Sequence, residues 1–380
     1  MTRLLSHFVI GSSVLDIGYS IRFPEKYLIA AIPIPRVFLL CLLMLGVASC
    51  SRPVQPISRT WMVMGTYASL TVSAEDAAAL ADRAELVRAD LEDMDNRLSI
   101  FKPDSEISTL NRCAGVSPVQ LSDLTAEALR LSLQYADATG GAFDPTVAPL
   151  MRFWGFNKGP AMSAVPERTA ISSVMEMVGF HHLSLSNRTA FLDQAGMSVD
   201  LGGIGKGYAV DVCYQDLVKK GLKNMMVNLG GNIRCRGSAG PGQPWSIGVR
   251  DPFNPDRIVG TLHLADGMAV ATSGNYEKFV EIEGKRYSHI MDPRTGRPVE
   301  GVASVTVIAT NAVEADAMST AIFVMGLKES QPVLRRLPGC CIIFIPDERP
   351  TRVYVSSGVR DCFTADPAFA GQILDIAPDK

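Results

Sequence analysis

Three segments carry side chains of the kinds that act on phosphate groups. The first, from Ser198 to Asp211, contains the stretch GGIGKG, with Asp200 before it and Lys206 inside it. Backbone N–H groups of such a turn can approach a phosphate, and the start of a following helix favours an anion. A Walker loop needs Ser or Thr after its lysine, and a dinucleotide fingerprint needs a different glycine spacing. Alone, such a turn is as often structural as functional, but the flanking Asp and Lys favour a nucleotide.

The second segment predicts a helix that begins at Asn311, because Glu314 completes a capping box with it. Asp316 and Thr320 are four residues apart, so they share one face of this helix. A carboxylate and a hydroxyl in this arrangement suit a hard cation such as Mg²⁺, which prefers oxygen ligands. The alternative, favoured by spacing alone, is that Thr320 hydrogen-bonds back to the carbonyl of Asp316 and that water covers the carboxylate.

The third segment brings a histidine to a turn. A predicted strand delivers His289 and Asp292 to a turn built by Pro293 and Gly296, where a rigid scaffold commonly presents reactive groups. The chain has five histidines, and one beside an aspartate is a candidate general base or phosphate contact. The alternative is a histidine packed in the core.

The elements that must position these segments follow from periodicity. Alternating strands and helices mixed with hairpin-like runs favour an α+β fold, built as a single compact catalytic body of mixed sheets and helices or as two packed subdomains. We expect strands over residues 66–72, 197–201, 225–229, 245–249, 287–291, 303–308 and 340–345. Helices are expected over residues 75–96, 124–139, 208–220 and 312–325.

The amino-terminal residues differ from the rest of the chain. An apolar run, Val37 to Ala48, follows Arg36 and ends in the sequence VASC at Cys50, which resembles a bacterial lipoprotein signal with Cys50 as the lipidated residue. The run is too short to span a bilayer. The alternative is a buried helix or an uncleaved anchor. The predicted divisions are a signal or leader over 1–50, a tether over 51–59, a catalytic domain over 60–355 and a carboxyl-terminal extension over 356–380.

Composition excludes several classes of protein. The 380 residues carry a formal net charge of −3, which argues against general nucleic-acid binding. Hydrophobic residues make up 47% and charged residues 20%, so the chain is not intrinsically disordered. The cysteines show no zinc-site spacing, and we predict no disulfide.

Read together, these segments and four shorter ones resemble the ApbE family of FAD:protein FMN transferases, whose members are commonly exported lipoproteins. The matching blocks, in order, are Met64-Gly65-Thr66, Gly141 to Thr146, Asp200 to Gly207, Asn228 to Gly231, Thr272-Ser273-Gly274, His289 to Pro298 and Glu314 to Ala317. Seven ordered blocks are more specific than any one of them.

The resemblance implies transfer of the FMN half of FAD to a Thr or Ser hydroxyl of an acceptor protein, with release of AMP. It implies acceptors such as Rnf-type or Nqr-type subunits of sodium-pumping electron-transfer complexes, or other FMN-binding domains. It implies a location in the cell envelope, lipid-anchored and facing the periplasm. The residues it implies for contact with FAD are Met64, Phe101, Ala142, Phe143, Asp144, Asp200, Lys206 and Met291.

The resemblance also implies a cation, Mg²⁺ or Mn²⁺, between the Gly203 carbonyl, Asp316 and Thr320, and His289 as the catalytic residue. We expect His289 or Asp292 to remove the proton of the acceptor hydroxyl. Two positions depart from the family pattern: Phe101 is often Tyr, and Ser319 is a second Asp in some relatives. Two other functions stay open, namely an FAD pyrophosphatase that releases FMN and AMP, and a non-catalytic FAD-binding lipoprotein.

Overall fold

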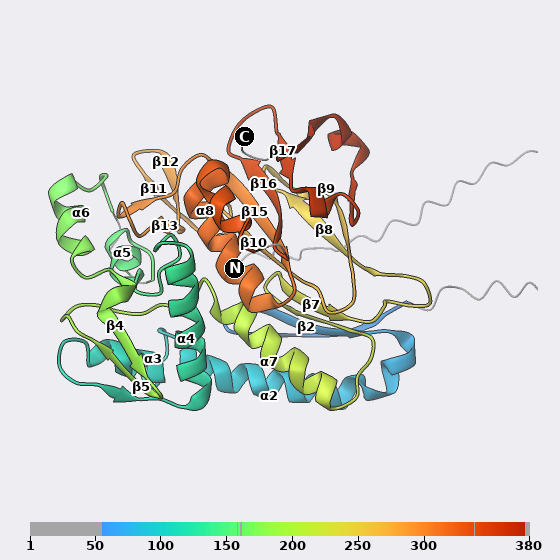
Figure 1. Ribbon diagram of the computed structural model, residues 1–380, viewed down its shortest axis with the longest axis horizontal. Helices are drawn as coiled ribbons and strands as arrows, with labels where there is room; N and C mark the ends of the chain where they lie inside the picture. Colours follow the sequence, from blue (N-terminus) through green and yellow to red (C-terminus); the bar gives the residue numbers. More distant parts are fainter. Residues whose placement is uncertain (1–54, 158, 160–161, 338, 377–380) are drawn as a thin grey trace, which may run out of the picture. The chain divides into compact units, whose positions relative to one another are not determined.

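A nine-stranded sheet forms the centre of the protein (Figure 1). The computed structural model describes residues 55–157, 159, 162–337 and 339–376, so the predicted signal and Cys50 lie outside the described residues. Neighbouring strands are antiparallel except for the last pair, which is parallel. The strands in spatial order are β1 (Ile57–Val63), β2 (Thr66–Val72), β6 (Met225–Leu229), β7 (Asn232–Arg236), β10 (Ala269–Gly274), β15 (Val302–Ala309), β16 (Cys341–Pro346), β17 (Val353–Val355) and β19 (Ile373–Asp375).

Helices and smaller sheets surround this central sheet. The helices are α2 (Leu80–Leu98), α3 (Glu106–Arg112), α4 (Asp123–Ala138), α5 (Ala148–Phe153), α6 (Arg168–Met175), α7 (Gly205–Lys219) and α8 (Ala312–Leu334), with 3₁₀ turns η1 (Ala74–Ala79), η2 (Phe180–His182), η3 (Ser357–Val359) and η4 (Pro367–Gln372). Two three-stranded sheets have the orders β3 (Val119–Gln120), β5 (Thr189–Leu192), β4 (Leu183–Ser186) and β18 (Phe363–Ala365), β9 (Asn254–Leu264), β8 (Trp245–Asp251). Two hairpins are β11 (Phe279–Ile282) with β12 (Lys285–Ser288) and β13 (Met291–Asp292) with β14 (Arg297–Pro298). Among the described residues, none of the helices has the length and apolar character needed to cross a membrane.

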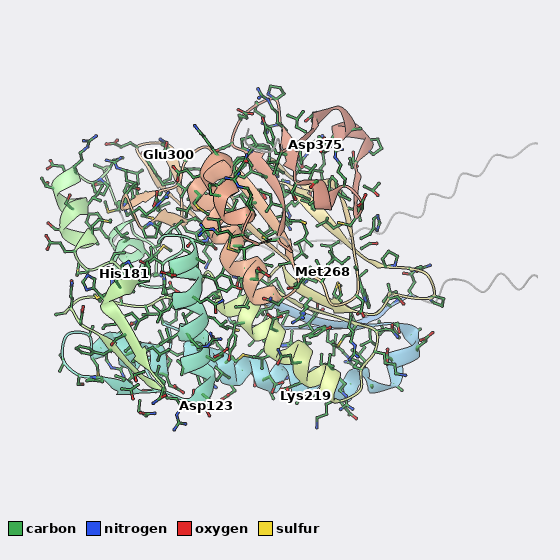
Figure 2. All side chains as sticks on the ribbon, viewed as in Figure 1. Asp123, His181, Lys219, Met268, Glu300 and Asp375 are labelled. Carbon is green, nitrogen blue, oxygen red and sulfur yellow. The ribbon has the colours of Figure 1, made fainter. Side chains whose placement is uncertain are left out.

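The central sheet is covered on both faces at β16. On β16, Ile342 and Phe344 join the core formed with α2, α4, α7 and α8, whereas Ile343 and Ile345 join a second core formed with β8 and β9. Side chains fill both layers, and Met268, labelled in Figure 2, packs against the second core. Successive residues of a strand point to opposite faces, so a strand with two covered faces is apolar throughout. This explains the continuous apolar run predicted as a strand over 340–345.

Helices α7 and α8 cross in close contact, and the crossing holds the start of α8. A side-chain carbon on Gly207 would overlap the carbonyl oxygen of Ala312 and lie 2.7 Å from Asp316 Cβ. The carboxylate of Asp211 on α7 accepts hydrogen bonds from the N–H groups of Ala312 and Val313, each at 2.9 Å. These N–H groups have no partner within α8, so Asp211 supplies one to each.

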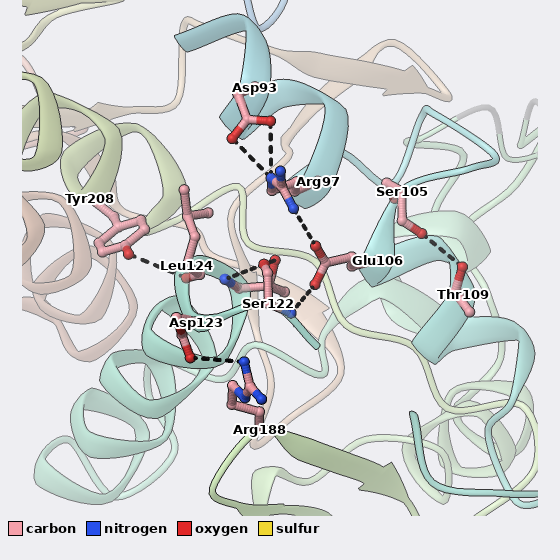
Figure 3. Close-up of polar contacts among 11 residues, drawn as sticks. Asp93, Arg97, Ser105, Glu106, Thr109, Ser122, Asp123, Leu124, Arg188 and Tyr208 are labelled. Carbon is pink, nitrogen blue, oxygen red and sulfur yellow. Dashed lines mark hydrogen bonds and ion pairs between the residues drawn. The ribbon is translucent and has the colours of Figure 1, made fainter. Parts of the chain in front are cut away.

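A second polar network joins α2, α3 and α4 (Figure 3). Glu106 accepts from Arg97 at 3.0 Å and from the backbone N–H of Ser122 at 2.7 Å, just before α4 begins. Burial alone would raise the pKa of Glu106, but the hydrogen bonds from Ser122 and Arg97 outweigh it and hold this pKa below its usual range. Tyr208 on α7 donates to the carbonyl of Leu124 at 3.2 Å. The network fixes α4, whose carboxyl-terminal end leads into the predicted block over 141–146.

Most of the predicted elements are confirmed, including the α+β class. The expected strand over 197–201 is wrong. Val199 pairs with a side chain, because its N–H donates to Asn111 Oδ1 at 2.7 Å and its carbonyl accepts from Asn111 Nδ2 at 2.9 Å. The N–H of Asp200 donates to the carbonyl of Pro145 at 2.8 Å. An extended segment whose partners are an asparagine and a loop has the sequence pattern of a strand without belonging to a sheet.

Other boundaries also differ from expectation. The strand expected over 287–291 is interrupted at 289–290, and the helix expected over 312–325 continues to Leu334 across a break at Gly326. Beyond residue 355, β18 pairs with β9 and β19 pairs with β17, so the described part of the expected extension belongs to the body. Contacts group the chain from Pro53 onward as one compact unit rather than as two subdomains.

The contact at Gly207 predicts a stability difference between two glycines of α7. We expect Gly207→Ala to lower the free energy of unfolding by about 1–3 kcal/mol, because the added methyl group meets the backbone of α8. Gly205→Ala is the matched control, since the nearest atom to its added methyl group would be Leu201 Cβ, at an ordinary contact distance of 3.6 Å, and alanine is the better helix former. Urea unfolding followed by circular dichroism measures both variants. Equal stability of the two would contradict the close packing of α7 on α8.

Candidate functional site

The glycine-rich turn at the start of α7 faces a buried carboxylate on α8. The N–H of Gly207 donates to Asp316 Oδ2 at 2.8 Å, and Lys206 Nζ lies 3.8 Å from Asp316 Oδ1. The Asp316 side chain is only 6% exposed, so water does not cover it. The alternative of a solvated carboxylate, drawn from spacing alone, is therefore wrong. A buried carboxylate needs such partners, because an isolated charge in the interior is costly.

Thr320 lies one helical turn after Asp316, against the same glycine-rich turn. A side-chain carbon on Gly203 would lie 3.2 Å from both Thr320 Oγ1 and Phe143 Cε2, so the glycine allows a close approach to these two side chains. Thr320 Oγ1 is 3.4 Å from Ser273 Oγ at the end of β10. The hydrogen bond back to the carbonyl of Asp316 comes from Ser319, at 2.9 Å. The alternative in the sequence analysis assigned this bond to Thr320, whereas in the structure Ser319 makes it.

The donor atoms gathered here suit a hard cation. Asp316 supplies a carboxylate oxygen and Thr320 a hydroxyl, and the backbone of Gly203, whose carbonyl is the third predicted ligand, lies against that hydroxyl. Across the part of the chain that the structure describes, there is no group of three or more His, Cys, Asp or Glu side chains placed to hold a metal. A cation at this place would thus have one carboxylate ligand and would keep positions for water or phosphate oxygens. That ligand set fits Mg²⁺, which is commonly held by one or two carboxylates together with substrate phosphates.

The block over 141–146 is organised by Asp144. Its Oδ1 accepts from the N–H and the hydroxyl of Thr146 at 2.7 and 2.6 Å, and its Oδ2 accepts from the N–H of Phe180 at 2.9 Å. Burial raises the pKa of Asp144 even though these hydrogen bonds oppose the rise. Its carboxylate is already engaged and holds the loop that carries Ala142 and Phe143, which are both buried. Asp144 thus has a positioning role in this structure.

A large cavity opens beside the segment that leads into the glycine-rich turn. Asp200 Oδ1 accepts from the N–H of Gly202 at 2.8 Å, and its Oδ2 accepts from Asn157 Nδ2 at 2.8 Å. Asn157 also lines the cavity, whose volume is about 880 Å³. Phe101, which is half exposed, lines the same cavity. Two of the predicted FAD contacts are thus related to this cavity, Phe101 directly and Asp200 through its hydrogen bond with Asn157. Further lining residues are Asn111, Arg152, Met197 and Ser198.

The two predicted methionines occupy different surroundings. Met64 lies in the turn between β1 and β2, at the end of the sheet where β6 ends and where β10 ends with Ser273 and Gly274. Met291 is buried in a cluster with Trp154 and Tyr287. It is not among the residues that line the 880 Å³ cavity.

His289 lies where the expected strand breaks. Its Nδ1 is 3.1 Å from the carbonyl oxygen of Lys278, which can only accept, so Nδ1 carries the proton and Nε2 is the nitrogen that can receive one. Burial, followed by the charges of Lys278 and Lys206, lowers the pKa of His289 to about 4, although the hydrogen bond to the Lys278 backbone opposes the shift. The imidazole is therefore neutral at pH 7.

Asp292 has its carboxylate engaged by Arg294. It accepts from the N–H and Nε of Arg294 at 2.9 Å each and from a terminal nitrogen at 3.0 Å. Its carbonyl accepts from the N–H of Gly296 at 2.8 Å. Asp292 therefore builds the turn after His289, and its expected part in proton removal stays a prediction.

Sequence reasoning missed three residues that hold the site together. Asn111 and Asn157 fix the segment before the glycine-rich turn, and Asp211 fixes the start of α8. Each acts on a partner at least 43 residues away, which no local pattern reveals. Ser273 stood out in the sequence only as part of a short turn block.

Comparisons with known proteins agree on one family. A family model described as "ApbE family" matches residues 64–344. The chain is 34% identical to the FAD:protein FMN transferase of Escherichia coli (strain K12) over 290 residues, 75% of this chain and 82% of that protein. It is also 34% identical to the FAD:protein FMN transferase of Treponema pallidum (strain Nichols), over 86% of this chain and 94% of that protein. The solved structure of the flavin transferase ApbE from Vibrio cholerae is similar, with a TM-score of 0.72 at 30% identity, over 82% of this chain and 100% of that chain.

The surroundings of His289 predict its titration. We expect nitrogen-15 NMR to show the Nδ1-protonated neutral ring from pH 8 down to about pH 5, with protonation centred near the lowered pKa of about 4. The sign follows from burial, which disfavours the charged ring and so lowers the pKa. His289→Gln assigns the signal by its disappearance. A midpoint near 6.5, the ordinary value for histidine, would contradict the buried setting.

Proposed function

This chain belongs to the ApbE family and is a transferase that moves FMN from FAD to an acceptor protein, and we propose how its residues carry out that reaction. FMN passes to a Thr or Ser hydroxyl of the acceptor, and AMP leaves. One observation carries this proposal: the glycine-rich turn packs directly against the helix face that bears Asp316 and Thr320.

The proposed place for FAD follows from the cavity and the turn next to it. We assign one ring system of FAD to the 880 Å³ cavity, where the half-exposed Phe101 offers an aromatic face. Asn157 lines this cavity and bonds to Asp200, which precedes the glycine-rich turn. The diphosphate would then lie over the start of α7, whose N–H groups and Lys206 favour negative charge. The remaining proposed contacts of FAD are Ala142, Phe143, Asp144, Met64 and Met291.

The proposed cation ligands are Asp316, Thr320 and the carbonyl of Gly203. Mg²⁺, or Mn²⁺ in its place, supplies positive charge for the diphosphate when it is bound. The carboxylate of Asp316 is held by the N–H of Gly207 through Oδ2, which leaves Oδ1 directed toward Lys206 and the turn.

His289 is the proposed proton acceptor. Its Nε2 takes the proton of the acceptor hydroxyl, whose oxygen forms a bond to the FMN phosphorus. The bond between that phosphorus and the bridging oxygen breaks, and AMP leaves with the electron pair. Because burial keeps the ring neutral at pH 7, His289 is in the form that can accept a proton.

The acceptor and the location are proposed from the sequence alone. An acceptor of the Rnf or Nqr type, or another FMN-binding domain, supplies the hydroxyl. The lipoprotein-like box ending at Cys50 supports a lipid anchor that holds the enzyme at the periplasmic side of the cell envelope.

The reaction predicts a covalent product that needs the cation. The chain from Ser51 onward, mixed with FAD, Mg²⁺ and an FMN-acceptor domain, should give an acceptor that fluoresces on a denaturing gel and gains the mass of one FMN. EDTA or Asp316→Ala should abolish the product, because EDTA removes the cation and Asp316→Ala removes one of its proposed ligands. Free FMN and AMP with an unlabelled acceptor would instead indicate a pyrophosphatase, and intact FAD throughout would contradict catalysis on this acceptor.

Replacing the proposed proton acceptor should separate binding from chemistry. We expect His289→Gln to lower the transfer rate by about 10²–10⁴-fold, the usual range for a positioned base, while the affinity for FAD changes little. Flavin fluorescence titration and single-turnover labelling measure the two quantities. His263→Gln is the control, since His263 lies on β9 and bonds to Ser246 and Thr364. Unchanged turnover in His289→Gln would exclude this role.

A further inference from the structure

A row of three hydroxyl groups crosses from α8 to β10 beside the proposed cation ligands. Ser319 Oγ donates to the backbone carbonyl of Asp316 at 2.9 Å. Ser273 Oγ lies 2.8 Å from Ser319 Oγ and 3.4 Å from Thr320 Oγ1. Ser319 is fully buried, so its hydroxyl must be satisfied within this row. The row therefore connects the Asp316 backbone to the side chain of Thr320.

The direction of each hydrogen bond follows from counting protons. A serine or threonine hydroxyl has one proton to donate and two lone pairs that accept. A carbonyl oxygen cannot donate, so the Ser319 proton is committed to Asp316. Ser319 must then accept from Ser273 across 2.8 Å, since two lone pairs facing each other at that distance would repel. The Ser273 proton is committed in turn.

Thr320 is left with only one role toward Ser273. Since Ser273 has no second proton, the 3.4 Å contact is one in which Thr320 donates and Ser273 accepts. With its proton turned toward β10, Thr320 Oγ1 has its lone pairs available on the side of Gly203. A hydroxyl oxygen in this state can bind a cation or accept from a donor, but it cannot donate to a phosphate.

We propose that Ser273 and Ser319 are positioning residues that fix Thr320 as an oxygen ligand for a divalent cation. This inference rests on the proposed function, in which Thr320 is a ligand of the cation. It also assigns a task to Ser319, whose side chain orients its neighbour through Ser273 and has no direct path to the cation. Groups behind a ligand that set its orientation typically change metal affinity by about 10–100-fold when removed.

Binding of Mn²⁺ alone tests the proposal without catalysis. Electron paramagnetic resonance measures free Mn²⁺ in a titration of the chain from Ser51 onward. We expect Ser273→Ala and Ser319→Ala each to weaken binding by about tenfold or more. The double variant should bind about as weakly as either single one, because the row is broken once in each case. Ser273→Thr keeps a hydroxyl at this position and should therefore keep most of the affinity for Mn²⁺ that Ser273→Ala loses.

A neighbouring threonine provides the matched control. Thr272 lies next to Ser273 on β10, but its hydroxyl pairs with Thr306 at 2.9 Å. Thr272→Val should therefore leave Mn²⁺ affinity unchanged. Melting temperatures of all variants identify any that lose affinity by unfolding, and the Ser273→Thr result then decides.

Two further variants separate this inference from the proposed cation site. If Asp316→Asn and Thr320→Val lose Mn²⁺ binding while Ser273→Ala binds like the wild type, the orienting role is overturned and the cation site stands. If Asp316→Asn and Thr320→Val also bind like the wild type, the cation site itself is wrong. Additive losses in the double variant would show that the two serines act separately and would overturn the connected row.

Discussion

Helices α7 and α8 are far apart in the sequence, and each places a buried carboxylate against backbone N–H groups of the other. The site depends on these reciprocal hydrogen bonds. Asp211 on α7 accepts the first N–H groups of α8, while Asp316 on α8 accepts the N–H of Gly207 at the start of α7. Each carboxylate lies in the interior and accepts from backbone donors of the other helix, and Asp211 also pairs with Arg234 at 2.7 Å. Such partners offset part of the desolvation cost of a buried carboxylate. The glycine at 207 allows the helices to approach closely enough for both bonds.

The chemistry of the site comes from surroundings more than from residue types. Asp144, Asp200, Asp292 and Asp316 are all aspartates near the same turns, yet the first three accept hydrogen bonds from their own loops. Of these four, Asp316 is the one with a carboxylate oxygen near a lysine, Lys206. Likewise, His289 is set apart from an ordinary surface histidine by burial and by the Lys278 carbonyl, which fixes the position of its proton.

Alternation and periodicity along the sequence correctly predicted the elements whose structure depends on neighbouring residues. The strands over 66–72 and 225–229 are β2 and β6, because alternating apolar residues face one covered side. The segment over 197–201 was wrongly predicted as a strand, because the backbone of Val199 hydrogen-bonds to the Asn111 side chain instead of to a neighbouring strand. The glycine-rich turn and the Asp316 face were visible separately from their spacing. Their meeting could not be predicted from spacing, since no periodicity links residues more than a hundred positions apart, and only the family resemblance implied it.

The separation of α7 and α8 along the chain also sets when the site can exist. The bond between Gly207 and Asp316 spans 109 residues, and that between Asp211 and Ala312 spans 101. Contacts of such high sequence separation form late, because a long loop must close before they contribute. A chain emerging amino-terminus first would present the residues of the 880 Å³ cavity and the glycine-rich turn before α8. The proposed cation site is therefore complete only after α8 has packed on α7, and a chain that ends before α8 lacks Asp316 and Thr320.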